Sequence, residues 1–159
     1  MLMLLFHVGD NLYALDSSQV VEVIAMVALR KIYHVPEYVA GFFNYHGTIV
    51  PVIDLCNLIG GITCRPRFST RIVMVNYTAE DGRQKRLGLM AERVTETLQR
   101  PDINSKNAAI ASDVPYLGQM FMDELGMIQL IYWEHLITEA QHASLLVGGS
   151  METNGASSN

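Results

Sequence analysis

The amino-acid sequence predicts an all-β chain, built as a barrel or a sandwich. Short segments rich in β-branched and aromatic residues recur along it, separated by turn-forming Gly, Pro, Asn and Asp. Long segments with the helical period of about 3.6 residues are few. A third observation is an internal repeat in the order of these segments. Two related small barrels packed together would explain it, since one alone would have only a marginal core.

The first elements are predicted to be a hairpin and a short helix. Residues 4–15 are mostly apolar and are interrupted by a turn-forming cluster at residues 9–11, so we expect two strands joined by a tight turn. Residues 16–19 offer a helix cap with Gln at its third position. Apolar residues at helical spacing follow within residues 20–24, so a short helix is expected over residues 17–24.

The remaining elements follow from similar signals. Gly and Pro interrupt the apolar run at residues 41–51, as expected for short strands with sharp bends. Residues 54–59 are expected to form one helical turn, because Gly60 and Gly61 follow them. The other expected elements are a strand at 70–77, a hairpin turn at 80–82, a return to the sheet at 87–90, a surface loop at 102–113 and a strand at 125–132.

The internal repeat relates the two halves of the chain. Both halves carry the same order of apolar segments, at an offset of about 74 residues for one pair of segments and about 77 to 78 for the other. The matched segments are residues 12–15 and 20–24 with residues 86–89 and 94–98, and residues 38–59 with residues 116–137.

Composition and charge are those of a soluble protein with one compact unit. Of its 159 residues, 50% are hydrophobic and 17% are charged, far from the signature of disorder. The net charge of −5 provides no basic field for phosphate contacts, which argues against nucleic acid as a partner. No signal peptide is visible, and the longest apolar stretch, residues 49–59, is too short to span a bilayer. The sequence therefore predicts a cytoplasmic protein without direct membrane insertion.

Catalytic and metal-binding motifs are absent from the sequence. Cys56 and Cys64 lie eight residues apart, and the five histidines do not complete a zinc site at a suitable spacing, so we expect two reduced thiols. No nucleophile elbow, phosphate-binding glycine loop or metalloprotease helix is present. We expect no catalytic residue, no metal and no cofactor, and infer that the protein is not an enzyme but works by binding.

One run of residues carries a family resemblance. In residues 39–55, Gly41 is followed by two phenylalanines, by Asn-Tyr-His-Gly and then by Pro-Val-Ile-Asp-Leu. This order resembles the signature of the CheW family, in which a glycine, two apolar residues, Asn-x-Arg-Gly and Pro-Val-x-Asp-Leu recur, and the resemblance covers roughly residues 4–138. It implies a mainly β fold of two intertwined five-stranded SH3-like β-barrels with short helices. Residues 1–148 would form a single CheW-like domain of two barrel subdomains, and residues 149–159 a disordered tail.

The resemblance also implies a function. CheW-like proteins are non-catalytic adaptors that couple chemoreceptors to a CheA-type histidine kinase in a two-component signalling array. The expected partners are the regulatory domain of such a kinase, the tip of a methyl-accepting chemoreceptor and other CheW-like domains, at receptor arrays on the inner face of the membrane. The alternative is a CheW-like structural or competing partner in pilus motility or second-messenger control, which does not activate the kinase. A ligand-binding role would need a defined pocket.

Five residues resemble the positions at which the family contacts receptor and kinase: Val20, Glu22, Gly41, His46 and Gly47. Glycine permits a positive φ or the close approach of a partner, although barrel bends without a partner role explain Gly41 and Gly47 equally well. Glu22 is either a contact or a solvated carboxylate. His46 stands where the family usually has arginine, which is always charged, whereas a histidine side chain has an ordinary pKa of about 6.5. Either the receptor is altered or the pathway and its partners differ.

Overall fold

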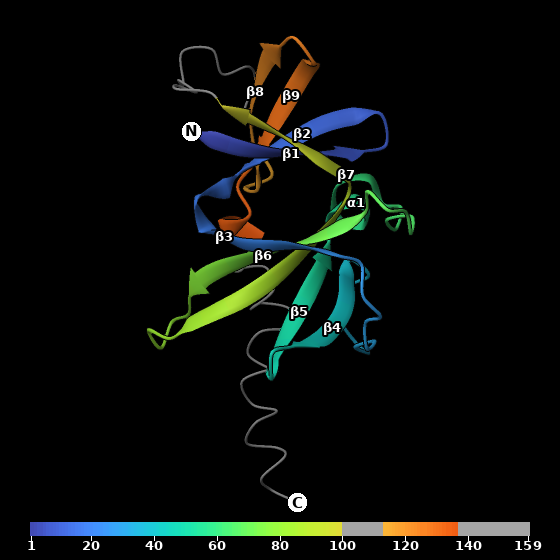
Figure 1. Cartoon of the computed structure of the whole chain (residues 1–159), viewed down its shortest axis with the longest axis vertical. Helices are drawn as coiled ribbons and strands as arrows, with labels where there is room; N and C mark the ends of the chain where they lie inside the picture. The colour runs from blue at the N-terminus through green and yellow to red at the C-terminus, as the bar shows by residue number, and fades with distance from the viewer. Residues whose placement is uncertain (100–112, 137–159) are drawn as a thin grey trace, which may run out of the picture.

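The computed structural model describes residues 1–99 and 113–136 (Figure 1). β-Strands account for most of these residues, so the predicted mainly β class is confirmed. The described elements are, in chain order, β1 (Leu2–Val8), β2 (Asn11–Asp16), the 3-10 turn η1 (Ser17–Gln19), β3 (Val20–Ala25), β4 (Val39–Tyr45), β5 (Thr48–Asp54), α1 (Leu55–Gly60), β6 (Arg71–Thr78), β7 (Gln84–Gln99), β8 (Leu117–Asp123) and β9 (Gly126–Ile131).

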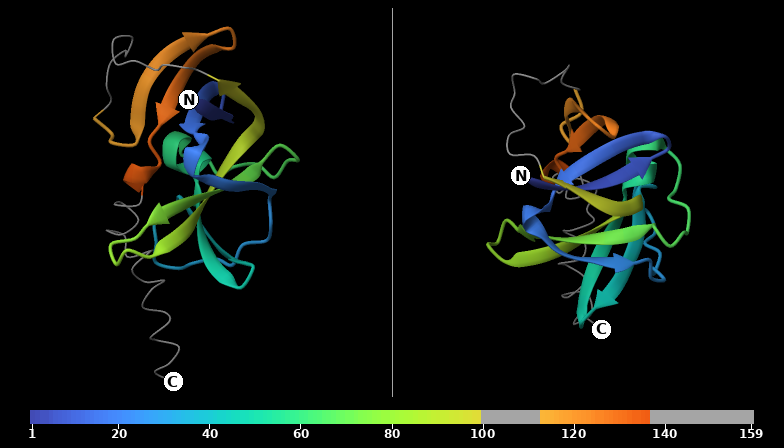
Figure 2. Two further views of the ribbon diagram at one scale, coloured as in Figure 1. Left: turned by 60° about the vertical axis from the view of Figure 1, so that its left-hand side comes forward. Right: turned by 45° about the horizontal axis from the view of Figure 1, so that its top comes forward.

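The described strands form two groups of five that share β7. One group has the order β3-β6-β7-β5-β4, and the other has the order β7-β1-β2-β9-β8. We call them the lower group and the upper group, after their places in Figure 1, where β7 passes from one to the other. Figure 2 shows the same division from two further sides. The SH3-like form of each group stays a prediction.

A bend allows β7 to belong to both groups. Its first half pairs with β6, and its second half pairs with β1. The change of partner coincides with Arg93, which has a left-handed φ of 52°, and with a register shift between Leu5 and His7 in β1. Irregularities of this kind increase the local twist and redirect a strand, so one strand of 16 residues serves both groups.

The sequence repeat reappears as an exchange of strands between the two halves of the chain. Val52 of β5 pairs in parallel with Gly88 of β7. Leu130 of β9, the repeat counterpart of Val52, pairs in parallel with Ala14 of β2, the counterpart of Gly88. Each half therefore contributes strands to both groups, and neither group is complete without the other half.

Equivalent backbone hydrogen bonds support this correspondence. The amide of Asp54 donates to the carbonyl of Tyr38 at 2.7 Å, and the amide of Tyr132 donates to the carbonyl of Tyr116 at 2.8 Å. The two donors occupy matching places in the repeat, and so do the two acceptors. The repeat found in the sequence is therefore also a repeat in the backbone.

The apolar core also joins the two halves. Its larger cluster contains buried residues from both groups, among them Leu15 of β2, Val52 of β5 and Trp133 near the end of the described chain. A smaller cluster fills the upper group and consists of Met3, Leu5, Ala14, Phe121, Ile128 and Leu130. Over the described residues, the larger core therefore crosses the boundary between the two groups.

Helix α1 agrees with its prediction. Asp54 caps it, since its Oδ1 accepts the amide of Asn57 at 3.0 Å, and Gly61 ends it with a left-handed φ of 77°. The predicted hairpin at residues 4–15 is present as β1 and β2, and the predicted turn at residues 80–82 joins β6 to β7. These elements depend on signals that lie close together in the sequence.

The predicted helix at residues 17–24 is wrong. Only Ser17–Gln19 form a helical turn, η1. Its cap is as predicted, because the side chain of Asp16 accepts a hydrogen bond from the amide of Ser18 at 2.9 Å. β3 begins at once with Val20 and pairs antiparallel with β6. Valine and isoleucine dominate this segment, and their branched side chains suit a pleated strand once a partner strand is present.

Two further predictions concern residues that lie almost entirely outside the described ranges. Apart from Asp113, the expected loop at 102–113 lies outside the described residues, and so does the expected tail at 149–159. The assignment of residues 1–148 to one domain stays a prediction for the same reason. Within residues 1–99 and 113–136, no helix has the length and apolar character needed to cross a membrane.

Candidate partner-binding site

An open hollow lies between the two end strands of the lower group. β3 and β4 stand at opposite ends of the order β3-β6-β7-β5-β4. The hollow has a volume of about 530 Å³ and is bounded by β3, by the segment that follows β3, and by the last residues of β4. Its lining is mostly apolar and consists of Glu22, Ile24, Ala25, Val27, Ala28, Phe43, Asn44, Tyr45 and His46.

A hydrogen bond from Tyr45 to Glu22 joins the two end strands across this hollow. The Tyr45 hydroxyl, at the end of β4, donates to Oε1 of Glu22 on β3. Tyr45 is only 9% exposed, whereas Glu22 is exposed. The hydrogen bond to Glu22, together with burial, raises the pKa of Tyr45, so the phenol keeps its proton and remains a donor at neutral pH.

Neighbouring side chains hold the ring of Tyr45. The guanidinium of Arg86 lies 5.3 Å from the ring centroid, and its Nε donates to Oδ1 of Asn76 at 3.3 Å. The imidazole of His46 meets the same ring edge-on, with centroids 4.4 Å apart and planes at 65°. The position of the Tyr45 hydroxyl is therefore set by side chains from β6, β7 and the β4–β5 turn.

His46 and Gly47 form the two-residue turn between β4 and β5. Both have a positive φ, 51° and 88°, and Tyr45 pairs with Thr48 on either side of them. Two-residue hairpin turns of this type need a positive φ at both positions, which glycine adopts freely and histidine adopts more readily than most residues. Oδ1 of Asn44 accepts the amide of Gly47 at 2.7 Å. The turn therefore presents the exposed His46 side chain at the rim of the hollow.

Gly41 allows the segment after β3, which forms one wall of the hollow, to lie close to β4. Its φ is 144°, and a Cβ atom at this position would lie 2.5 Å from the carbonyl oxygen of Arg30. The close approach allows Arg30 and Phe42 to exchange two backbone hydrogen bonds, of 2.8 and 2.9 Å. These bonds hold the segment that contains Val27 and Ala28 against β4, so Gly41 has a structural role that the hollow depends on.

The structure gathers most of the five predicted site residues, but not all of them. Glu22 and His46 line the hollow, Gly47 adjoins it in the turn, and Gly41 supports its wall. Val20 does not line it. Val20 is the first residue of β3, half-buried, opposite Val75 of β6, and it packs against the main core.

The fold agrees with that of the proteins to which the chain is similar. A family model described as a CheW-like domain matches residues 2–141, which is most of the chain. The chain belongs to the CheW family. The sequence resemblance is therefore confirmed, and it extends across all described elements.

Curated relatives and a solved structure support this CheW assignment. The chain is 26% identical over 139 residues to the probable chemotaxis protein CheW of Rhizobium etli, covering 86% of each protein. It is 26% identical over 94 residues to the chemotaxis protein CheW of Helicobacter pylori, covering 59% of this chain and 54% of that protein. The crystal structure of the scaffolding protein TtCheW from Thermoanaerobacter tengcongensis superposes with a TM-score of 0.66 at 26% identity, covering 82% of both chains.

Sequence reasoning missed Tyr45 as part of this candidate site. The sequence signal for Tyr45 as a site residue is weak, since tyrosine is common in β-strands, also directly before a turn. A buried tyrosine normally places its hydroxyl on a polar partner, but the partner here lies 23 residues earlier. Only the meeting of β3 and β4 identifies Glu22 as that partner.

A second polar cluster lies at the junction of the two strand groups. Asp54, Cys56 and Cys64 are buried and place three potential metal ligands within 4.8 Å of one another. The two sulfur atoms are, however, only 2.6 Å apart. A tetrahedral zinc ion with Zn–S bonds of about 2.3 Å holds two sulfurs about 3.7 Å apart. The cluster therefore does not fit zinc in this geometry.

Proposed function

We propose that this chain is a non-catalytic adaptor that couples chemoreceptors to a CheA-type histidine kinase. Membership of the CheW family over residues 2–141 supports a scaffold rather than an enzyme. The matched relatives are named as chemotaxis proteins, and the matched solved structure is named as a scaffolding protein. The partners are the regulatory domain of the kinase, the tip of a methyl-accepting chemoreceptor and other CheW-like domains, at receptor arrays on the inner face of the membrane.

The single observation that carries the proposal is the hollow between β3 and β4. Three of the five residues expected at the partner contact, Glu22, His46 and Gly47, lie in it or at its rim, and a fourth, Gly41, shapes it. The Tyr45–Glu22 bond links the two walls of this hollow, which supports a binding role for it.

The lining favours a protein segment as the occupant. Apolar side chains such as Ile24, Val27 and Phe43 form most of it, and they would bury apolar residues of a partner. One oxygen of the Glu22 carboxylate accepts from Tyr45, which leaves the second oxygen able to accept from a cationic residue of the partner. We assign this hollow to the receptor tip.

The test reconstitutes the purified chain with a CheA-type kinase and a methyl-accepting receptor encoded in the same genome. A coupling adaptor increases receptor-dependent phosphorylation of the kinase. Replacing Glu22 with Lys reverses the charge at the hollow and is expected to weaken receptor binding by about tenfold or more. The matched control is Glu80→Lys, because Glu80 is an exposed carboxylate in the β6–β7 turn, outside the hollow. If the native chain binds neither protein, the proposal is wrong.

A second candidate function follows from His46. This residue stands where the family usually has arginine, and it lies at the rim of the hollow. A partner matched to histidine could belong to pilus motility or second-messenger control, where the chain would act as a structural or competing partner. The same assay separates the two functions, because a competing partner binds receptor or kinase without increasing phosphorylation.

A further inference from the structure

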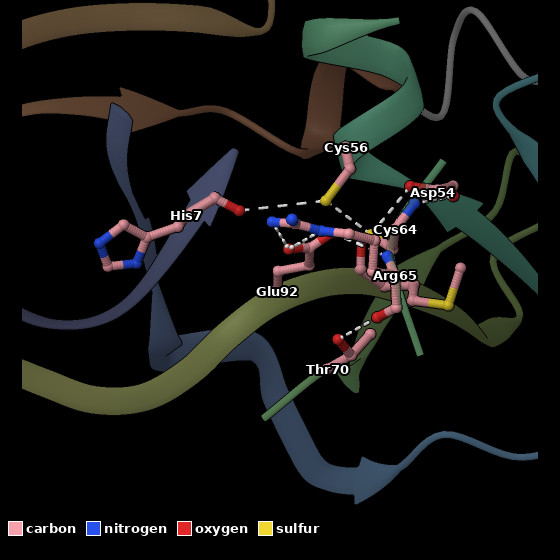
Figure 3. Close-up of polar contacts among 8 residues, drawn as sticks. His7, Asp54, Cys56, Cys64, Arg65, Thr70 and Glu92 are labelled. Carbon is pink, nitrogen blue, oxygen red and sulfur yellow. Dashed lines mark hydrogen bonds and ion pairs between the residues drawn. The ribbon is translucent and has the colours of Figure 1, made fainter. Parts of the chain in front are cut away.

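Cys56 and Cys64 bring two free thiols into contact in the interior. Cys56 lies in α1, and Cys64 lies in the connection between α1 and β6. Their sulfur atoms are 2.6 Å apart, and the side chains are 4% and 5% exposed. Figure 3 shows the two sulfurs side by side, next to Asp54.

One buried carboxylate holds both cysteines in place. Oδ1 of Asp54 accepts the amide of Asn57 and so fixes the start of α1, which carries Cys56. Oδ2 of Asp54 accepts the amide of Cys64 at 3.0 Å. The backbone therefore brings the two cysteines together, since Asp54 positions both of their segments.

A second carboxylate fixes the next residue of the connection. Oε2 of Glu92 on β7 accepts the amide of Arg65 at 2.7 Å, and Oε1 pairs with the guanidinium of Arg65 at 2.9 Å. Oγ1 of Thr70 donates to the carbonyl of Arg65 at 2.5 Å. Figure 3 shows these contacts beside the cysteine pair. The backbone of the connection is thus held at Cys64 and at Arg65.

The two sulfurs lie close enough together to form a disulfide with a small movement. A disulfide requires about 2.05 Å, so closure needs an approach of about 0.5 Å. Zinc would require the sulfurs to move apart by about 1 Å. We propose that Cys56 and Cys64 form a reversible disulfide when the protein meets a peroxide, so that the α1–β6 connection is a redox-responsive site.

The reaction uses groups already in contact. The Cys56 thiolate attacks hydrogen peroxide and becomes a sulfenic acid, releasing hydroxide. The Cys64 sulfur then attacks the Cys56 sulfur, the S–O bond breaks, and the hydroxyl leaves as water with the proton of Cys64. In sum, two thiols and one peroxide give one disulfide and two waters. A dithiol reductant reverses the change by taking back the two electrons.

Asp54 can relay the proton of Cys64 to the leaving hydroxyl in the second step. Its Oδ1 lies 3.0 Å from the Cys64 sulfur, within reach of the thiol hydrogen. The hydrogen bond to Cys56, burial and the neighbouring Asp54 carboxylate all raise the pKa of Cys64, so this thiol keeps its proton until it attacks. We therefore assign Cys56 as the thiol that peroxide oxidises first and Cys64 as the resolving thiol.

Hydrogen peroxide titration of the reduced full chain tests the proposal. After quenching, the mass of the denatured chain should be lower by about 2 Da, and the two reactive thiols should disappear together, both changes being reversed by dithiothreitol. The change should occur within a single chain, so a non-reducing gel should show no dimer. Thiols that persist in the folded chain, at peroxide levels that oxidise the denatured chain, would contradict the proposal.

Two variants test the assignment of the cysteines. Cys64→Ser should leave a sulfenic acid on Cys56 that dimedone traps, whereas Cys56→Ser should give little dimedone adduct. The native chain alone answers the disulfide question if either variant folds poorly. Equimolar zinc that binds the reduced native chain and protects both thiols from peroxide would overturn the proposal in favour of a metal site.

Discussion

The hydroxyl of Tyr45 donates to the carboxylate of Glu22 across the two end strands of the lower group. Together with the backbone bonds between Arg30 and Phe42, this contact closes the group on itself. The hollow lies beside the closure, so the residues that complete the fold here also bound the candidate partner site. Substitutions at this place therefore need controls that separate stability from binding.

Replacing Tyr45 with Phe removes only the hydroxyl. We expect a loss of about 1 kcal/mol in the free energy of unfolding, as for a typical hydrogen bond, and weaker receptor binding because the walls are no longer linked. Urea unfolding measures the first effect, and titration with a receptor fragment measures the second. The control is Tyr33→Phe, at a site 72% exposed and outside the hollow. Equal effects of the two substitutions would contradict a special role for Tyr45.

Gly41→Ala tests the close approach of Arg30. The added Cβ would meet a backbone oxygen at 2.5 Å in a conformation that only glycine adopts freely, so we expect a loss of about 3 kcal/mol or more in the free energy of unfolding. The control is Gly82→Ala, because Gly82 has a φ of 82° but nothing within 4 Å of the added atom. It should lose only about 1 to 2 kcal/mol. The difference between the variants, from denaturant unfolding, measures the clash together with the greater backbone strain at a φ of 144°.

Glu92→Gln tests the carboxylate that holds Arg65. Burial by itself raises the pKa of Glu92, but hydrogen bonds from the side chain and backbone of Arg65 outweigh it and leave the pKa lowered. At neutral pH the variant should lose about 2 kcal/mol of unfolding free energy, as for hydrogen bonds to a charged group.

The pH dependence of this variant has a defined sign. Because the folded-state pKa is lowered, the stabilisation is fully present above the pKa of an unfolded glutamate, about 4.3, and is lost as the pH falls through the folded value. The stability difference between native chain and Glu92→Gln should therefore shrink in acid. Glu96→Gln, at an exposed residue of the same strand, is the control. A difference that stays constant from pH 7 to about pH 3 would show that charge plays no part.

His46→Arg tests whether the rim residue acts as a cation. If His46 contributes a positive charge to the contact, receptor affinity of the native chain should fall with rising pH, and the arginine variant should lack this fall because arginine stays charged. Binding isotherms at several pH values measure it. His34→Arg is the control, because His34 is exposed, also has a positive φ and lies outside the hollow. A flat profile in both the native chain and the His46→Arg variant would rule out a charged His46.

The sequence predicted elements whose causes are local. Asp54 and Gly61 lie next to α1 and determine its ends, and the turn at residues 9–11 lies between the strands it joins. The family run at residues 39–55 is likewise continuous, so it could be recognised without a structure. The internal repeat was visible because the same order of strands recurs in both halves.

Tertiary structure decided what local patterns could not. Residues 20–24 have apolar residues at helical spacing and a cap before them. They nevertheless form β3, because pairing with β6 satisfies their backbone and buries part of their branched side chains. Tyr45 meets Glu22 because β3 and β4 lie at the two ends of one group of strands. Cys64 meets Cys56 because Asp54 accepts backbone amides from both of their segments. A single sequence records which side chains are available. The distances that give them a common chemistry arise only when the two halves of the chain fold around one core.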